Sequence, residues 1–389
     1  MTAGALLVGC RPQELQSGLD AFVQAKMEHS HIPGLAAAVI KNRDVVWSKG
    51  YGWADIDRRV EMSPDTLQNI GSISKTIVGT AVMQLKEIGA LRLDDEVDKY
   101  LDFPVRNANH PDSPITFLDL MTHRSSIADG SAYARGYGCG DPPISLEEWI
   151  PGYFVSGGAF FEAAENFHSW APGERYEYNN VAFGLLAYLV EVITGTSFDE
   201  YCQNRIFEPL GMSDTSWYLR DIDTTRHAIP YSYVSDGEIR GPAWGGSLQG
   251  VVGSNGPPPV SNGYAANCLY NHPNFPDGFL RTTVRQLAKY QIACLSGGRG
   301  ILSEASICEM LTPQMAITDN GESGQGLVWY SHELSNGERV WRHTGGDPGI
   351  NTLFDFHPSS GRGVIVFANT WGAGLAEVGE RLFEEIEHL

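Results

Sequence analysis

Strand-like segments lie near both ends of this sequence, and helical patterns fill its middle. Residues 34–40 and 44–48 are consistent with two strands joined by a polar turn, and residues 50–55 continue the second strand. Strand-like runs return late in the chain, at 326–334, 338–343, 352–356 and 363–369. Because the backbone of a strand must find hydrogen-bond partners, this arrangement predicts one antiparallel sheet assembled from the two ends of the chain.

Helical periodicity accounts for most of the remaining chain. It runs over 12–29, 74–89, 181–194, 198–207, 282–295 and 373–389. We therefore expect an α+β fold in which helices flank the sheet and an all-helical domain is inserted between its halves. The predicted domains are a discontinuous sheet domain, 12–104 with 286–389, and a mainly helical insert, 105–285, whose loops contact the substrate.

Net charge narrows the range of partners. The 389 residues include 47 acidic and 27 basic side chains, a formal net charge of −20. A negative field of this size repels phosphate backbones, so nucleic acid is not an expected partner. No run of 18 or more apolar residues occurs, so we predict no transmembrane segment. The expected partner is a small-molecule or short-peptide substrate, and the oligomeric state stays open.

The cysteines and the N-terminal residues leave the compartment open. Leu7-Val8-Gly9-Cys10 has the form of a lipoprotein cleavage site, but no positive residue precedes it. Two interpretations of this segment therefore stay open, the remnant of a signal peptide and a frayed N-terminal segment. Localisation is therefore either cytoplasmic or periplasmic. No pair of cysteines is spaced as C-x-x-C, which disfavours a zinc or redox motif. Cys139 and Cys268 lie in loops and could pair in an oxidising compartment, whereas we expect Cys202, Cys294 and Cys308 to be buried in helices.

The sharpest chemical motif is Ser72-Ile-Ser-Lys75, at the start of the apolar helix predicted over 74–89. Residues three apart on a helix share one face, so the two side chains meet. A serine hydroxyl needs an adjacent base to become a nucleophile, and a lysine in apolar surroundings shifts toward the neutral amine that can serve. The alternative is an ordinary helix-capping serine beside a solvated lysine.

Two further motifs follow in the chain. Tyr178-Asn-Asn180 precedes the helix predicted over 181–194; the tyrosine could act as a general acid, or the asparagines could only cap the helix. His343-Thr-Gly-Gly-Asp347 ends a strand pattern, where paired glycines either let a ligand approach the backbone or form a tight turn.

In this order, the three motifs resemble those of the serine β-lactamase and penicillin-binding protein superfamily, in its class C-like branch. That branch also contains D-alanyl-D-alanine carboxypeptidases, D-aminopeptidases and β-lactamase-fold esterases, and the similarity extends over about residues 15–385. The resemblance implies the β-lactamase/transpeptidase-like fold and an acyl-enzyme mechanism without metal or organic cofactor. It also implies roles for individual residues. Ser72 would be the nucleophile, Lys75 its base, Tyr178 part of the proton relay, Asn180, His343, Thr344 and Gly345 substrate-binding residues, and the backbone N–H groups of Ser72 and Gly346 the oxyanion hole.

One departure bears on the substrate. Penicillin-recognising members usually carry lysine where this chain has His343, and the lysine charge holds a substrate carboxylate. The expected function is therefore hydrolysis of amide or ester bonds in small molecules or short peptides, including peptides of D-amino acids. A β-lactamase or D-Ala-D-Ala carboxypeptidase is the first alternative, and a non-catalytic sensor or scaffold on the same fold is the second. The G-x-S-x-G elbow of α/β-hydrolases is absent from the sequence.

The acyl group that fits is not evident from the motifs. We expect it to depend on loops 127–145 and 236–278, whose aromatic side chains either line a pocket or only pack. These aromatic residues are Tyr133, Tyr137, Trp244, Tyr264, Tyr270 and Phe275.

Overall fold

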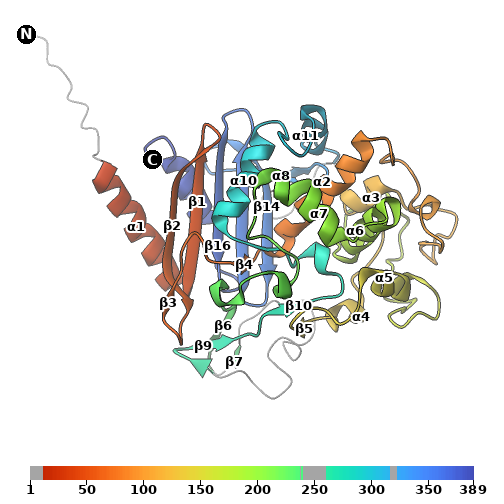
Figure 1. Cartoon of the computed structure of the whole chain (residues 1–389), viewed down its shortest axis with the longest axis horizontal. Coiled ribbons are helices and arrows are strands. Elements are labelled where there is room, and N and C mark those ends of the chain that lie inside the picture. Colours follow the sequence, from red (N-terminus) through yellow and green to blue (C-terminus); the bar gives the residue numbers. More distant parts are fainter. Residues whose placement is uncertain (1–11, 237, 240–259, 316–321) are drawn as a thin grey trace, which may run out of the picture.

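The computed structural model describes residues 12–236, 238–239, 260–315 and 322–389 (Figure 1). Its largest element is an eight-stranded sheet in the order β12-β13-β14-β15-β16-β1-β2-β3, antiparallel throughout. The strands are β1 Gly34–Lys41, β2 Asp44–Asp55, β3 Val60–Glu61, β12 Glu322–Gln325, β13 Tyr330–Glu333, β14 Arg339–Asp347, β15 Ile350–His357 and β16 Arg362–Ala368. The sheet predicted from the two chain ends is thus confirmed.

Strand β1 joins the two parts of the sheet. It pairs with β16 on one side, with Leu35 opposite Ala368, and with β2 on the other. In Figure 1 the red and orange strands of the N-terminal part lie directly beside the blue strands of the C-terminal part. All of β1 except Lys41 is buried, which explains why its sequence is an almost continuous apolar run.

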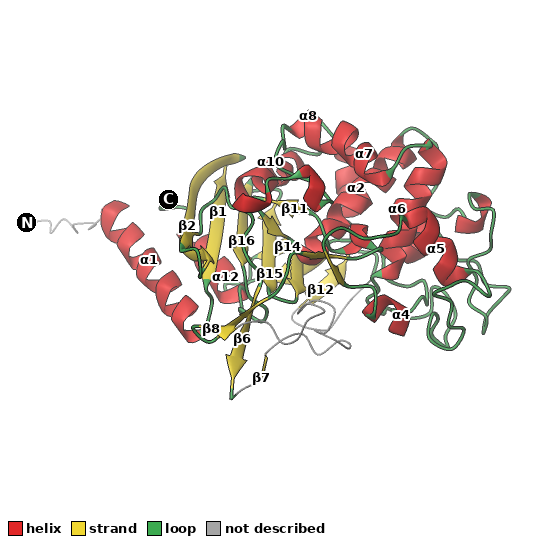
Figure 2. Ribbon diagram, turned by 60° about the horizontal axis from the view of Figure 1, so that its bottom comes forward, coloured by secondary structure: helices red, strands yellow, loops and turns green. Residues whose placement is uncertain are grey.

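Helices cover both faces of the sheet, and β1 supplies alternate residues to each (Figure 2). Leu35, Ala37 and Val39 belong to the apolar cluster formed with α1 (Pro12–His29) and α12 (Ala376–Glu385). The intervening residues Ala36, Ala38 and Ile40 belong to the larger cluster, which includes residues of α2 (Ser74–Glu87) and α10 (Val284–Leu295).

The middle of the chain is mainly helical and packs on the α2 side. Its helices are α3 Phe117–Met121, α4 Ser131–Ala134, α5 Leu146–Phe154, α6 Val181–Thr194, α7 Phe198–Cys202 and α8 Glu208–Leu210, with α11 Glu304–Met310 following later in the chain. Single 3-10 turns are η1 Gly71–Ile73, η2 Val97–Lys99, η4 Leu219–Asp221, η5 Thr224–Arg226 and η6 Phe275–Asp277, and η3 Gln203–Phe207 is a π-helix that continues α7. Short strands also occur outside the main sheet, namely β4 Gln68–Asn69, β5 Gly138–Cys139, β6 Tyr231–Ser235, β7 Glu238–Ile239, β8 Val260–Ser261, β9 Tyr264–Ala266, β10 Tyr270–Asn271 and β11 Arg281–Thr282. The insert thus contains small strand pairs as well as the expected helices.

Some local expectations need correction. The strand expected from residue 326 begins at Tyr330, because Gly326 donates its N–H to the carbonyl of Trp329 in a turn where Val328 has a positive φ of 74°. Cys308 is exposed: α11 turns Ile307 and Met310 inward, and Cys308 lies on the other side of the helix.

The remaining cysteines follow the expectation where the structure describes them. Cys202 and Cys294 are buried, and Cys139 of β5 forms a disulfide with Cys268, which lies between β9 and β10. The lipoprotein-like segment 7–10 lies outside the described residues, as does Trp244.

No single helix of the described chain has the length and apolar character to cross a bilayer. The segments Val181–Thr194 and Phe198–Leu210 would be long and apolar enough only as a pair, and they meet at an angle of 82°.

Candidate active site

Ser72 lies in the turn η1, immediately before α2 and beside strand β14. Two glycines allow this close approach. A Cβ on Gly345 would lie 2.1 Å from the carbonyl oxygen of Ile70, and a Cβ on Gly71 would lie 2.9 Å from the backbone nitrogen of Gly346. Gly71 also has a positive φ of 55°, which L side chains adopt only with strain. The motif predicted at 343–347 therefore packs directly against the turn that carries the serine.

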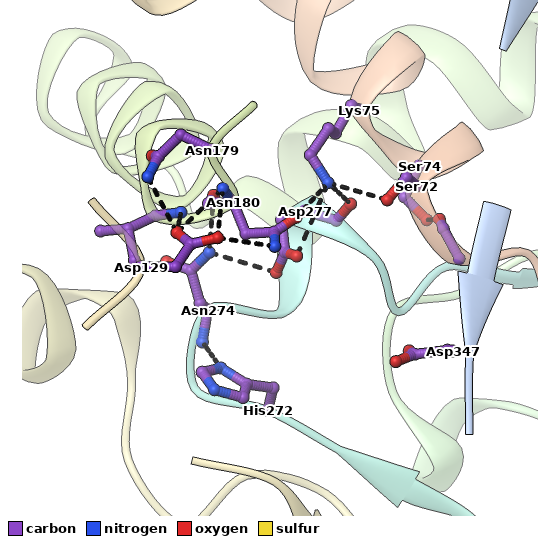
Figure 3. A network of polar contacts seen from close by, with 12 residues as sticks. Ser72, Ser74, Lys75, Asp129, Asn179, Asn180, His272, Asn274, Asp277 and Asp347 are labelled. Atoms are coloured by element: carbon purple, nitrogen blue, oxygen red, sulfur yellow. Dashed lines mark hydrogen bonds and ion pairs between the residues drawn. The ribbon is translucent and has the colours of Figure 1, made fainter. Parts of the chain in front are cut away.

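Lys75 is fully buried one turn after Ser72 (Figure 3). Its Nζ lies 3.0 Å from Ser72 Oγ, 2.7 Å from Asn180 Oδ1 and 2.7 Å from the backbone oxygen of Asp277. The last two atoms can only accept hydrogen bonds. A neutral amine that donates its two N–H groups to them keeps its lone pair for the serine hydroxyl.

Burial governs the protonation of Lys75. Desolvation lowers the pKa of Lys75 below its ordinary value, while the negative charges of Asp277, Asp129 and Asp347 oppose this shift. Desolvation is the largest effect, so the site favours the amine form more than water does. This is the protonation state that a base for Ser72 requires.

Asp129 fixes the orientation of Asn180 at the start of α6. Its carboxylate accepts hydrogen bonds from the Asn180 side-chain Nδ2 at 2.8 Å and from the backbone N–H groups of Asn180 and Val181 at 3.0 Å. Because Asn180 Nδ2 points to this carboxylate, its Oδ1 faces Lys75. Asn179 Nδ2 donates to the same carboxylate at 2.9 Å.

Tyr178 packs between Lys75 and a buried histidine. Lys75 Nζ lies 5.0 Å from the centre of the tyrosine ring, and His123 stacks on that ring with 4.4 Å between ring centres. The Nδ1 atom of His123 accepts the N–H of Asn179 at 3.1 Å. Desolvation lowers the pKa of His123 well below 6.5, so the ring is neutral and its proton is on Nε2.

His343 is a neutral hydrogen-bond acceptor in this site. It is 2% exposed, and desolvation lowers its pKa to about 3. Its Nδ1 lies 2.8 Å from the carbonyl oxygen of Thr344, which can only accept, so the single ring proton is on Nδ1. Nε2 is therefore a bare lone pair, and no described polar group hydrogen-bonds to it. Thr344 on the same strand is exposed.

The structure thus places Ser72, Lys75, Tyr178 and Asn180 together, with Gly345 and Gly346 against the serine turn. It also brings in Asp277, which no motif indicated and which follows Pro276 in a turn 202 positions after Lys75. Asp347 belonged to the third motif without an assigned role, and it accepts a hydrogen bond from Tyr137 Oη at 2.9 Å. Burial raises the pKa of Asp347 to about 8. The only sequence signal for Asp277 is its place in the segment Phe275-Pro-Asp-Gly278, which is typical of a turn.

The loop aromatics have different positions. Tyr133 and Tyr137 donate to Asp277 and Asp347, respectively, and Tyr270 donates to the carbonyl oxygen of Pro348. Phe275 is in the core. Tyr264 lines a separate surface groove between α1, β2 and β9.

The Beta-lactamase family model matches residues 19–384. This chain belongs to the beta-lactamase family. The resemblance predicted from the motifs is thereby confirmed, as is the fold. Over 221 residues the chain is 28% identical to Protein flp of Staphylococcus aureus, a match covering 56% of this chain and 41% of flp, so it spans less than half of that relative.

Solved structures agree with this assignment. The octameric penicillin-binding protein homologue from Pyrococcus abyssi superposes with a TM-score of 0.71 at 26% identity, covering 94% of this chain and 76% of the other. The D-amino acid amidase from Ochrobactrum anthropi SV3 gives a TM-score of 0.77 at 20% identity, covering 96% and 99%, which shows a shared fold.

Proposed function

We propose that this protein is a serine hydrolase that cleaves amide or ester bonds of small molecules or short peptides through an acyl-enzyme at Ser72. One observation carries the proposal. Asn180 Oδ1 and the backbone oxygen of Asp277 can only accept hydrogen bonds, so the neutral Lys75 amine donates to both and directs its lone pair to the hydroxyl of Ser72. No metal or organic cofactor is needed for this chemistry.

Acylation follows from this geometry. Lys75 takes the hydroxyl proton as Ser72 Oγ forms a bond to the substrate carbonyl carbon, and the carbonyl electron pair moves to oxygen. The backbone N–H groups of Ser72 and Gly346 are the proposed donors to that oxyanion; each such donor contributes about 10²–10³-fold in rate. When the C–N or C–O bond breaks, the proton returns to the leaving group through Lys75 and Tyr178. Water then attacks the ester in the same way and releases the acid.

The substrate proposal rests on His343. Its Nε2 is an acceptor without charge, so it offers no electrostatic anchor to a carboxylate. This supports neutral or amine-bearing amides and esters over β-lactams. D-Amino acid amides are reasonable first substrates, because the amidase from Ochrobactrum anthropi, named for them, shares the fold.

Covalent trapping tests the proposal. The protein is incubated with p-nitrophenyl acetate, nitrocefin and D-amino acid amides, and adducts are sought by intact mass. We expect one acyl group per chain on Ser72, and its loss in Ser72→Ala and Lys75→Ala. Full hydrolysis by Ser72→Ala would refute the mechanism. Absence of any adduct or turnover would favour the sensor or scaffold alternative.

A further inference from the structure

Asp277 places both its backbone and its carboxylate at the proposed base. It ends the turn η6 and is 2% exposed. Its carbonyl oxygen accepts from Lys75 Nζ at 2.7 Å, and its Oδ2 lies 3.7 Å from the same nitrogen. The backbone contact alone would orient the amine, and any residue type could supply it. The carboxylate adds a buried acidic group that this orienting role does not need. Burial raises the pKa of this carboxyl, and the charge of Lys75 and the hydrogen bonds from Tyr133 and Asn274 oppose that shift and favour the ionised form.

The carboxylate is held in place by neutral donors on two sides. Tyr133 Oη donates to Oδ2 at 2.8 Å, and Asn274 Nδ2 donates to Oδ1 at 3.1 Å. Asn274 is itself fixed, because its Oδ1 accepts from Trp149 Nε1 at 3.0 Å and its Nδ2 also donates to the Asn180 carbonyl at 2.9 Å. Figure 3 shows this network reaching from Lys75 through Asp277 to Asn274. The carboxylate therefore cannot turn away when the charge of Lys75 changes.

We propose that Asp277 is a positioning residue whose fixed negative charge makes the reactive site anionic, so that the enzyme selects substrates bearing an ammonium near the scissile bond over those bearing a carboxylate. This inference rests on the proposed function. Its physical basis is a charge balance: Lys75 acts as a base only as the neutral amine, and in that state the ion pair with Asp277 no longer exists.

Within the described part of the chain, no other group near Lys75 supplies a positive charge that would compensate the Asp277 carboxylate. The titratable side chains that face it or act on it are Asp129, Asp347, His123, His343, Tyr133 and Tyr178. Both histidines are buried and neutral, and neither tyrosine carries positive charge. A substrate ammonium therefore stabilises the neutral amine together with the Asp277 carboxylate. A substrate carboxylate instead holds Lys75 in the ammonium form, which cannot accept the proton of Ser72.

The first test is the pH dependence of kcat/KM, whose acidic limb reports loss of a proton from the coupled Lys75–Asp277 pair in the free enzyme. Asp277→Asn removes a negative charge 3.7 Å from Nζ and keeps the backbone contact. We expect the limb to move to lower pH by about one to three units. Tyr133→Phe is the matched control, because it removes one hydrogen bond to the carboxylate but keeps the carboxylate itself. Its limb should move less than that of Asp277→Asn. An unmoved limb in Asp277→Asn, or an equal shift in both variants, overturns the proposal.

The second test uses substrate charge at pH 7. Alanine p-nitroanilide, its N-acetyl form and its N-succinyl form place an ammonium, a neutral amide and a carboxylate near the same bond. In the wild type we expect kcat/KM to fall in that order. In Asp277→Asn the preference for the ammonium over the acetyl form should shrink by about three- to thirtyfold. A purely structural defect would lower all three rates alike and overturn the proposal.

If the thermal unfolding curve shows that Asp277→Asn does not fold, the wild-type order of the three substrates still tests the selectivity that the proposal requires. Faster hydrolysis of the succinyl than of the free-amine substrate by wild type refutes the inference. These results are separate from a failure of the proposed function, in which the wild type would form no acyl-enzyme at Ser72.

Discussion

Replacing Gly345 by alanine tests how tightly the serine turn and strand β14 must fit. The added Cβ would lie 2.1 Å from the carbonyl oxygen of Ile70 and 2.3 Å from Thr352 Oγ1. Thr352 Oγ1 already donates to that carbonyl at 2.7 Å, so both neighbours are held in place. The strand and the turn must then separate by about 1 Å to restore ordinary van der Waals contact.

Such a displacement acts on catalysis more than on stability. Overpacking a buried site costs about 1–3 kcal/mol, which lowers the Tm by a few degrees. Moving Gly346 relative to Ser72 removes a proposed oxyanion donor, which costs about 10²–10³-fold in kcat/KM. We therefore expect Gly345→Ala to remain folded and to lose at least about 10²-fold in kcat/KM.

The assay combines steady-state hydrolysis of p-nitrophenyl acetate with thermal unfolding. Gly18→Ala, at an exposed helical position where a Cβ meets nothing within 4 Å, is the matched control and should keep its activity, with a Tm no lower than that of the wild type. A Gly345→Ala protein with wild-type kcat/KM would refute the reasoning, because the clash would then be absorbed without moving the site. A fall in activity that only parallels loss of folded protein would refute it too.

Three further outcomes follow from particular contacts. The variant His343→Lys should raise turnover of nitrocefin relative to p-nitrophenyl acetate, because an ammonium would replace a neutral acceptor. An unchanged ratio of the two rates would show that His343 is not what limits hydrolysis of β-lactams. Burial lowers the pKa of His272 from 6.5 to about 4. Its contribution to stability is therefore present above pH 6.5 and is lost as the pH falls through 4. The variant His272→Gln should flatten the fall of Tm over that pH window, and an equally steep fall would contradict this. Reduction of Cys139–Cys268, which links positions 129 apart, should cost about 2–5 kcal/mol in denaturant unfolding, whereas identical curves with and without reductant would show that it is dispensable.

How well the sequence predicted a contact depended on how far apart in the chain the two residues lie. Ser72 and Lys75 are one helical turn apart, so their contact follows from local geometry alone. Strands β1 and β16 were predictable because their sequences are almost continuous apolar runs. Helix α12 is shorter than predicted, because the apolar residues Leu375 and Ile386 continue its pattern beyond both ends. The acceptors of Lys75 lie 105 and 202 positions away, in Asn180 and Asp277. Only the former belonged to a motif.

The sequence also did not show which titratable side chains are buried. The pattern at His343 left its charge open, and only its surroundings make it a neutral acceptor. Asp277 and Asp347 lie in turn-like segments where an acidic residue is ordinarily solvated. Their carboxylates are buried because separate parts of the chain close over them, and no local pattern records such closure.

The position of β1 between β2 and β16 has a consequence for biosynthesis. At ordinary translation rates of roughly 5–20 residues per second, the roughly 320 residues between β1 and β16 take on the order of 16–64 s to emerge. Throughout that interval the apolar strand β1 lacks the partner edge it has in the finished sheet. Strand β14, which packs against the turn bearing Ser72, also arrives late. A nascent chain therefore carries its serine long before it has an active site, and until β16 emerges only the edge of β1 that pairs with β2 can be covered as it is in the finished sheet.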